Sequence, residues 1–366
     1  MFLSPRRIAT ALVLSSCALG AVACGGDDEP EEQQPAATKP ADDLASMKSF
    51  LLEHTDRLEQ EAADLRAAAE DYHAQAEAVD FDYAALLESD REGVRSFVEK
   101  SQEAFGRANP AYEEMEGVVA GVPSLADYDV IIDAGADGSD PENAVPFSLK
   151  TPAGKTWKQP GNFNYLIETA VYGTEPKWAA KGVEPDLDGD GQVEFGEAMP
   201  DADFYVTAAR DFETTARELG AAAREWQPTP QDAFTALVVM TPTMSEYFDA
   251  WKNSRFVAGD KAREKAFVAA SRLQDIADIL GGLETVYAGV QPRIAAVDTA
   301  QAEQTGRDLG ALTDFAERLR DEEADGRKFD AEDAETLGTQ AQDQAEAIAG
   351  QISQAAGKLN IPLAEA

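Results

Sequence analysis

The chain has 366 residues, with 69 acidic and 31 basic side chains and a formal net charge of −38 at pH 7. Nucleic-acid binders and proteins that recognise anionic lipids need a basic face, so this balance excludes both classes. The chain is 44% hydrophobic and can bury a core, but its two histidines exclude a histidine-rich zinc cluster and argue against a histidine-based catalytic triad. We therefore expect a helical protein whose chemistry, if it has any, uses carboxylates.

Residues 1–23 have the pattern of a secretory signal peptide, with Arg6 and Arg7 in front of an apolar run and small residues before Cys24. The segment Ala21–Cys24 resembles the lipobox of bacterial lipoproteins, in which the cysteine becomes the lipidated first residue. An ordinary signal peptide with an incidental cysteine is the alternative. We expect an exported protein that is anchored in the bacterial cell envelope by a lipid on Cys24 and faces the periplasm or the cell surface.

Residues 24–42 are polar and rich in proline and glutamate, without apolar periodicity. This composition is typical of a disordered tether. Removal of residues 1–23 also removes Cys17, so Cys24 is the last cysteine and no disulfide can form within the mature chain. The folded part is expected over residues 43–359 and has to be stabilised by helix packing, with bound ions as a second source.

Helical periodicity dominates this part of the sequence. Apolar residues recur every seven positions from Leu51 to Tyr72 and predict a packed stripe on a first helix over residues 43–79. Further helices are predicted over residues 90–119, after Gly161 and over residues 201–226. Another starts at Thr229 and is kinked at Pro242, and the next runs from Asp260 to a break at Gly281 and Gly282. The last two are predicted over residues 292–320 and 331–359.

Residues 123–159 interrupt this pattern with glycine, proline, aspartate and asparagine, and predict a long irregular segment. Alternating patterns that would build a sheet are almost absent. We therefore expect an all-α fold of helical bundles, two of the four-helix type, with an irregular central segment.

The segment 186–197 matches the EF-hand calcium loop, in which oxygen ligands at fixed positions fold around one hard cation. Gly191 at position six permits the sharp turn. Asp186, Asp188 and Asp190 are the predicted calcium ligands at positions one, three and five. The others are the backbone carbonyl of Gln192 at position seven, Glu194 through a water molecule at position nine, and Glu197 with both oxygens at position twelve. A solvated acidic turn is the alternative.

Pro185 and Pro200 bracket this loop and argue against two full flanking helices. The sequence contains no clean partner loop. A single loop of this kind outside the cytosol favours a structural calcium ion over a signalling switch, and extracellular calcium modules bind with dissociation constants of about 10⁻⁴–10⁻³ M.

Four stretches together resemble the imelysin-like family. They are Pro123–Gly135, Gln159–Glu168 with the following Tyr172-Gly173, Tyr247–Phe256 and Ser271–Ile276. The family contains periplasmic iron-uptake lipoproteins and proteins once called peptidases, and the resemblance covers about residues 45–355. It implies an all-helical fold of two bundles with a metal site between them.

The resemblance also identifies a departure from the family pattern Gly-x-His-x-x-Glu. Glu168 matches the glutamate, but Tyr165 stands at the histidine position and Phe163 at the glycine position. Loss of the imidazole argues against zinc-peptidase chemistry, whereas the oxygens of Tyr165 and Glu168 would suit ferric iron. The alternative for Glu168 is a core carboxylate paired with an arginine.

The leading hypothesis is a calcium-binding lipoprotein of the cell envelope related to imelysin-like iron-uptake components, with calcium as one cofactor and iron as a second. A calcium-stabilised scaffold that presents a helical surface to an envelope protein partner, without a transport role, is the alternative. A metallopeptidase is least favoured, so we expect no enzyme activity, and the expected attachment to the membrane is through the lipid.

Overall fold

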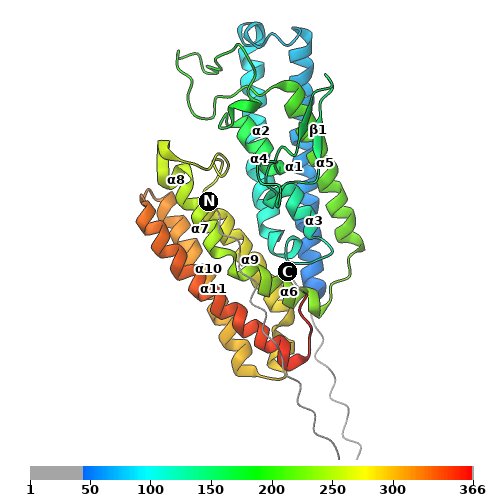
Figure 1. Cartoon of the computed structure of the whole chain (residues 1–366), viewed down its shortest axis with the longest axis vertical. Helices are drawn as coiled ribbons and strands as arrows, with labels where there is room; N and C mark the ends of the chain where they lie inside the picture. The colour runs from blue at the N-terminus through cyan, green and yellow to red at the C-terminus, as the bar shows by residue number, and fades with distance from the viewer. Residues whose placement is uncertain (1–43, 365–366) are drawn as a thin grey trace, which may run out of the picture. The chain divides into compact units, whose positions relative to one another are not determined.

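The computed structural model describes residues 44–364. The predicted signal peptide, the tether and Cys24 lie outside the described residues. Figure 1 shows a chain that is helical over most of the described length, so the all-α prediction is confirmed. No described helix is both long enough and apolar enough to cross a bilayer.

The amino-terminal bundle is built on helix α1 (Leu44–Ala78), whose buried stripe contains the predicted residues from Leu51 to Tyr72. α1 packs against α2 (Tyr83–Val119) and α5 (Ala202–Glu225), and the short helix α4 (Phe163–Val171) contacts both α2 and α5. The predicted helices over residues 43–79 and 201–226 are therefore confirmed within one or two residues.

Helix α2 begins earlier than the predicted residue 90. Its first residue is Tyr83, and the Asp82 side chain caps it by accepting a hydrogen bond from Ala85 N at 3.0 Å. Asp90 has non-helical backbone angles and accepts a hydrogen bond from Gly93 N at 3.0 Å, as a capping residue does. Asp90 therefore marks a kink within α2 and not the start of the helix.

The carboxyl-terminal bundle contains α6 (Pro230–Met240), α7 (Met244–Asn253), α9 (Arg272–Ala295), α10 (Thr299–Ala324) and α11 (Ala331–Leu359). Thr229 and Asp232 cap α6 reciprocally. The predicted kink at Pro242 is confirmed, because the 3₁₀ turn η3 (Thr241–Thr243) separates α6 from α7.

Three predictions in this bundle are wrong. The helix predicted over residues 292–320 is divided, because α9 ends at Ala295 and α10 starts at Thr299. Asp260 lies in the 3₁₀ turn η4 (Gly259–Lys261), which follows the short helix α8 (Arg255–Ala258), and it starts no long helix. Helix α9 continues through Gly281 and Gly282 to Ala295. The reason is tertiary packing, since α9 lies directly against α2 and needs a residue without a side chain at that contact.

The central segment is irregular, as predicted, but it contains short elements. Helix α3 (Ala126–Asp129) continues into the π-helical turn η1 (Val130–Ala134), and the antiparallel strands β1 (Ser148–Lys150) and β2 (Thr156–Lys158) form a small hairpin. The 3₁₀ turn η2 (Pro176–Trp178) follows α4. Strands of three residues are too short to give an alternating sequence signal.

The contact between α2 and α9 joins the two bundles and can be tested with two adjacent glycines. A Cβ atom on Gly282 would lie 2.1 Å from the Glu114 carbonyl oxygen, whereas one on Gly281 would meet no heavy atom within 4 Å. We expect Gly282→Ala to lower the free energy of unfolding by about 1–3 kcal/mol. The control Gly281→Ala should leave stability unchanged or raise it by up to about 1 kcal/mol. Equal effects of the two substitutions in denaturant unfolding would show that α2 and α9 are not in close contact.

Candidate metal centre

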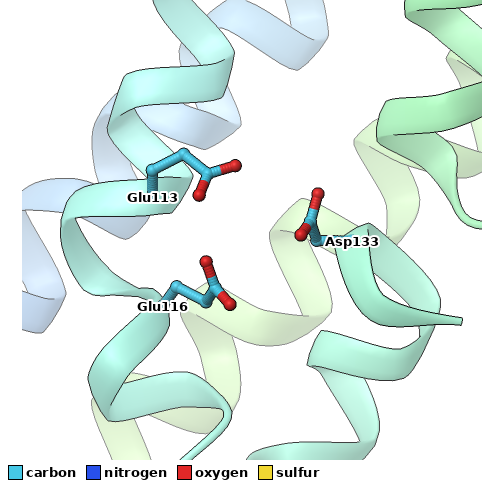
Figure 2. A group of neighbouring side chains, drawn as sticks. All are labelled: Glu113, Glu116 and Asp133. Carbon is cyan, nitrogen blue, oxygen red and sulfur yellow. The ribbon is translucent and has the colours of Figure 1, made fainter. Parts of the chain in front are cut away.

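Three carboxylates converge where α2 lies beside the central segment. Glu113 and Glu116 are three residues apart on α2 and so share one face of the helix, and Asp133 comes from η1. Their carboxylate oxygens lie within 4.8 Å of one another, and Figure 2 shows the three side chains directed toward the same space. Glu113 is fully buried and Glu116 is 3% exposed. We call these three residues the acid cluster.

Two further buried acids adjoin the acid cluster. Asp129 of α3 accepts a hydrogen bond from the Tyr112 hydroxyl at 2.7 Å. Asp275 of α9 accepts one from Asn109 Nδ2 at 2.9 Å. Because these acids come from different elements, the contact between α2, α3 and α9 is required to bring them together.

Arg272 of α9 is buried next to these acids. Its Nη1 lies 3.0 Å from Asp275 Oδ2 and 3.3 Å from Glu113 Oε2, and its Nη2 lies 3.7 Å from Asp133 Oδ2. In the part of the chain that the structure describes, no other basic side chain forms an ion pair with the five acids. One guanidinium therefore pairs with three of the five carboxyl groups.

Aromatic rings fix the position of this guanidinium. It lies over the ring of Phe267 at 4.2 Å and over the ring of Tyr247 at 4.6 Å. Such cation–π contacts are strongest where water is excluded, and Arg272 is 4% exposed. The Tyr247 hydroxyl also donates a hydrogen bond to Glu116 Oε1 at 2.7 Å, so one tyrosine contacts both the cation and a member of the acid cluster.

The acid cluster is short of positive charge and of hydrogen-bond donors. Glu116 Oε2 is buried and has no hydrogen-bond partner among residues 44–364. Burial, with Asp133 nearby, raises the pKa of Glu116 to about 7. Burial, with Asp275 and Asp133 nearby, raises the pKa of Glu113 well above its ordinary value. A proton or a bound cation is needed to offset these charges.

Glu168, one of the two residues predicted to bind iron, contacts backbone amides instead. Its Oε2 accepts a hydrogen bond from Phe267 N at 2.6 Å, and its Oε1 accepts bonds from Val268 N and Ala269 N at 2.9 Å each. Burial raises the pKa of Glu168 to about 7, and the three amides act in the opposite direction. Glu168 thus holds the loop that places Phe267 against Arg272.

Tyr165, the second predicted residue, is likewise bound to other groups. Its hydroxyl donates to Glu175 Oε2 at 2.9 Å, and the Lys177 ammonium lies 5.4 Å from its ring centre. Glu168 belongs to neither of the two groups of converging acids in the described chain. A metal site on this pair therefore stays a prediction.

The predicted calcium loop brings three of its six residues together. Oxygens of Asp186, Asp188 and Asp190 lie within 4.8 Å of one another. The Glu197 carboxylate accepts hydrogen bonds from Leu187 N at 2.8 Å, Asp188 N at 3.0 Å and Glu194 N at 2.8 Å, and so closes the loop. The side chains of Gln192 and Glu194 are exposed. Calcium binding by these six residues stays a prediction.

This loop contacts three other parts of the protein. Arg91 of α2 lies 3.9 Å from Asp186, and Gln102 of α2 donates a hydrogen bond to the Gly196 carbonyl oxygen at 2.8 Å. The Arg255 guanidinium of α8 lies 3.3 Å from the centre of the Phe195 ring, which also stacks on Tyr172 at 5.6 Å. Within the described chain, no helix directly flanks the loop, since η2 ends at Trp178 and α5 starts at Ala202. This agrees with the prediction from Pro185 and Pro200.

Both histidines lie on α1, each beside a carboxylate and outside the acid cluster. His54 Nδ1 lies 2.9 Å from Glu114 Oε2, and His73 Nε2 lies 2.9 Å from Asp203 Oδ1. Neither belongs to a group of converging metal ligands among residues 44–364.

Sequence patterns did not predict the acid cluster. The available signal was the position of Glu116 on the apolar face of α2, four residues after Tyr112 and three before Val119, both of which are fully buried. An acid in such a stripe is rarely buried without a partner. Asp133 and Arg272 did lie within stretches that carried the family resemblance, but spacing alone gave no reason to connect them.

The raised pKa of Glu116 predicts how the stability of the metal-free chain depends on pH. Since the folded-state pKa is about 7 and the ordinary value is 4.5, the native state binds more protons between these values. The free energy of unfolding should therefore fall as pH rises from 4.5 to 7, by up to about 3 kcal/mol from this group. Glu116→Gln should flatten this dependence in denaturant unfolding with a chelator present. The exposed Glu92→Gln on the same helix is the control, and an unchanged slope in Glu116→Gln would show that Glu116 is ionised throughout.

The chain is similar in sequence to one family of known proteins. A model of the imelysin family (Peptidase_M75) matches residues 51–354. The structure resembles that of an iron-regulated protein A precursor from Parabacteroides distasonis, with a TM-score of 0.43 and 12% identity over 87% of this chain and 97% of that chain. A comparison with curated proteins found no match. Because the family match covers most of the 366 residues, the chain belongs to the imelysin family.

Proposed function

We propose that this protein binds a hard metal cation, with iron as the physiological candidate, through Glu113, Glu116 and Asp133. The observation that carries the proposal is the convergence of the buried Glu113 and Glu116 with the partly buried Asp133. Glu116 also has an oxygen without a hydrogen-bond donor in the described chain. Only one guanidinium balances five acids in this region of the described chain. A cation would offset the remaining charge.

The ligand set favours the class of cation. Carboxylate oxygens are hard ligands that suit iron, manganese, magnesium and calcium, whereas zinc sites of peptidases use histidine. Membership of the imelysin family supports an iron-uptake-related role. We propose that the protein binds a cation and has no peptidase activity. We also propose that it is exported and attached to the cell envelope by a lipid on Cys24.

We propose calcium binding at residues 186–197 as a second, structural property. The convergence of Asp186, Asp188 and Asp190 supports it, and so do the contacts of the loop with α2 and α8. Calcium would reduce the repulsion between these acids and hold the loop against both helices. Val193 and Phe195 are 49% and 48% exposed, which leaves open the alternative of a calcium-stabilised scaffold that contacts an envelope partner.

The metal site can be tested by calorimetric titration of the full chain with Fe²⁺ under anaerobic conditions and saturating calcium. We expect one Fe²⁺ site in addition to calcium, with its affinity reduced about tenfold or more by Glu116→Gln and by Asp133→Asn, because each removes a charged ligand. The exposed Glu92→Gln should bind as the unmodified chain does. Absence of Fe²⁺ binding, or equal binding by all variants, would refute the site.

The calcium loop can be tested by thermal unfolding. If calcium binds with a dissociation constant of about 10⁻⁴–10⁻³ M, a concentration of about 10 mM should stabilise the chain by about 1.4–2.7 kcal/mol. Asp186→Asn combined with Glu197→Gln should abolish this gain. The control is Asp140→Asn, an exposed acid outside the loop, which should retain it. Equal stabilisation of both variants would place the calcium elsewhere.

A further inference from the structure

A cavity of about 370 Å³ lies beside the acid cluster. Its walls come from the first residues of α4, the segment 133–139 and the loop 264–267. Asp133 is the member of the acid cluster that lines this cavity, and Ala134 and Ser139 at its other side are exposed. The cavity therefore connects the solvent with Asp133.

The wall of this cavity is acidic. Four of its lining residues are acids, namely Asp133, Asp137, Glu168 and Glu264. The described lining contains no lysine and no arginine. Three backbone amides satisfy Glu168, and the Lys177 ammonium lies 3.5 Å from Asp137. Glu264 is half-buried and forms no ion pair with another residue in the described range. The charge that remains uncompensated at the wall is negative.

Two of the three asparagines of the wall, Asn109 and Asn164, have a side-chain oxygen without a hydrogen-bond donor in the described chain, while their amide nitrogens already donate. Asn109 Nδ2 donates to Asp275 Oδ1 at 2.9 Å, and Asn164 Nδ2 donates to Asp133 Oδ1 at 3.0 Å. The side-chain oxygens of these two asparagines accept no hydrogen bond from residues 44–364 and remain available to a ligand.

Two side-chain donors of the wall are also occupied. The Tyr165 hydroxyl donates to Glu175, and the Ser139 hydroxyl donates to Asp137 at 2.6 Å. The amino-terminal end of α4 is capped by Asn162, whose Oδ1 accepts a hydrogen bond from Tyr165 N at 2.8 Å. The cavity is consequently rich in acceptors and negative charge.

This lining discriminates between two forms of a metal. A hydrated cation presents positive charge and outward O–H donors, which match acidic and amide oxygens. A metal held by citrate or a similar anionic chelator presents negative charge and acceptors, which this wall repels. Six water molecules occupy roughly 180 Å³ at about 30 Å³ each, so a hexahydrated ion fits within the cavity.

We propose that the cavity admits an uncomplexed, hydrated divalent cation such as Fe²⁺ or Mn²⁺ and excludes anionic metal chelates. This inference rests on the proposed metal centre and adds the chemical form of its cargo. Asp133 is the first ligand that the ion meets, since it belongs to both the cavity wall and the acid cluster.

The test uses the full chain with saturating calcium in equilibrium dialysis. One arm contains Fe²⁺ without a chelator under anaerobic conditions, and the other contains preformed ferric citrate with radiolabelled citrate. We expect saturable retention of Fe²⁺ and no retention of labelled citrate. Retention of citrate together with iron in equal amounts would overturn the exclusion of chelates while leaving the metal centre intact. Absence of iron retention in both arms would overturn the metal centre and, with it, this inference.

A matched pair of variants tests the role of the wall charge. Glu264→Lys reverses a charge in the cavity, and Glu246→Lys makes the same change at an exposed site on α7. Association of Mn²⁺, followed by stopped-flow fluorescence, should slow by about threefold to tenfold in Glu264→Lys and stay unchanged in Glu246→Lys. Equal rates in the two variants would show that the cation does not enter through this cavity.

Discussion

The guanidinium of Arg272 is buried beside five carboxyl groups, and the resulting excess of negative charge is the constraint on which the rest of this structure depends. Glu113 and Glu116 come from the amino-terminal bundle, Asp133 from the central segment, and Arg272 and Asp275 from the carboxyl-terminal bundle. Burying charges is unfavourable unless they are paired. The cation that we propose for the acid cluster would therefore stabilise the α2–α9 contact, and its binding would be coupled to the joining of the two bundles.

Glu168 shows how a family motif can keep a structural role without its histidine. Its carboxylate accepts three backbone hydrogen bonds from residues 267–269, and this fixes the loop from which Phe267 contacts Arg272. With Tyr165 donating to Glu175, the two motif positions shape the wall of the cavity and the surroundings of the acid cluster. The metal site that we propose is formed by carboxylates on α2 and η1.

Much of the fold followed from local sequence patterns, because heptad spacing and capping residues act within one or two turns. The seven-residue stripe of α1 and the capping pair Thr229 and Asp232 are examples. The course of α9 through Gly282 could not be predicted, since it depends on the approach of the Glu114 carbonyl from another helix. The acid cluster was hidden for the same reason: its residues are up to 20 positions apart on separate elements, with Arg272 much further along the chain.

The central claim is that Glu113, Glu116 and Asp133 together hold a cation. The most direct test is a crystal structure of the calcium-loaded protein soaked with Mn²⁺, in which anomalous scattering locates manganese. Bound manganese should lie between the three carboxylates, at oxygen-ligand distances of about 2.0–2.6 Å. Manganese found only in the loop at residues 186–197, or no ordered manganese beside a fully occupied calcium site, would contradict it.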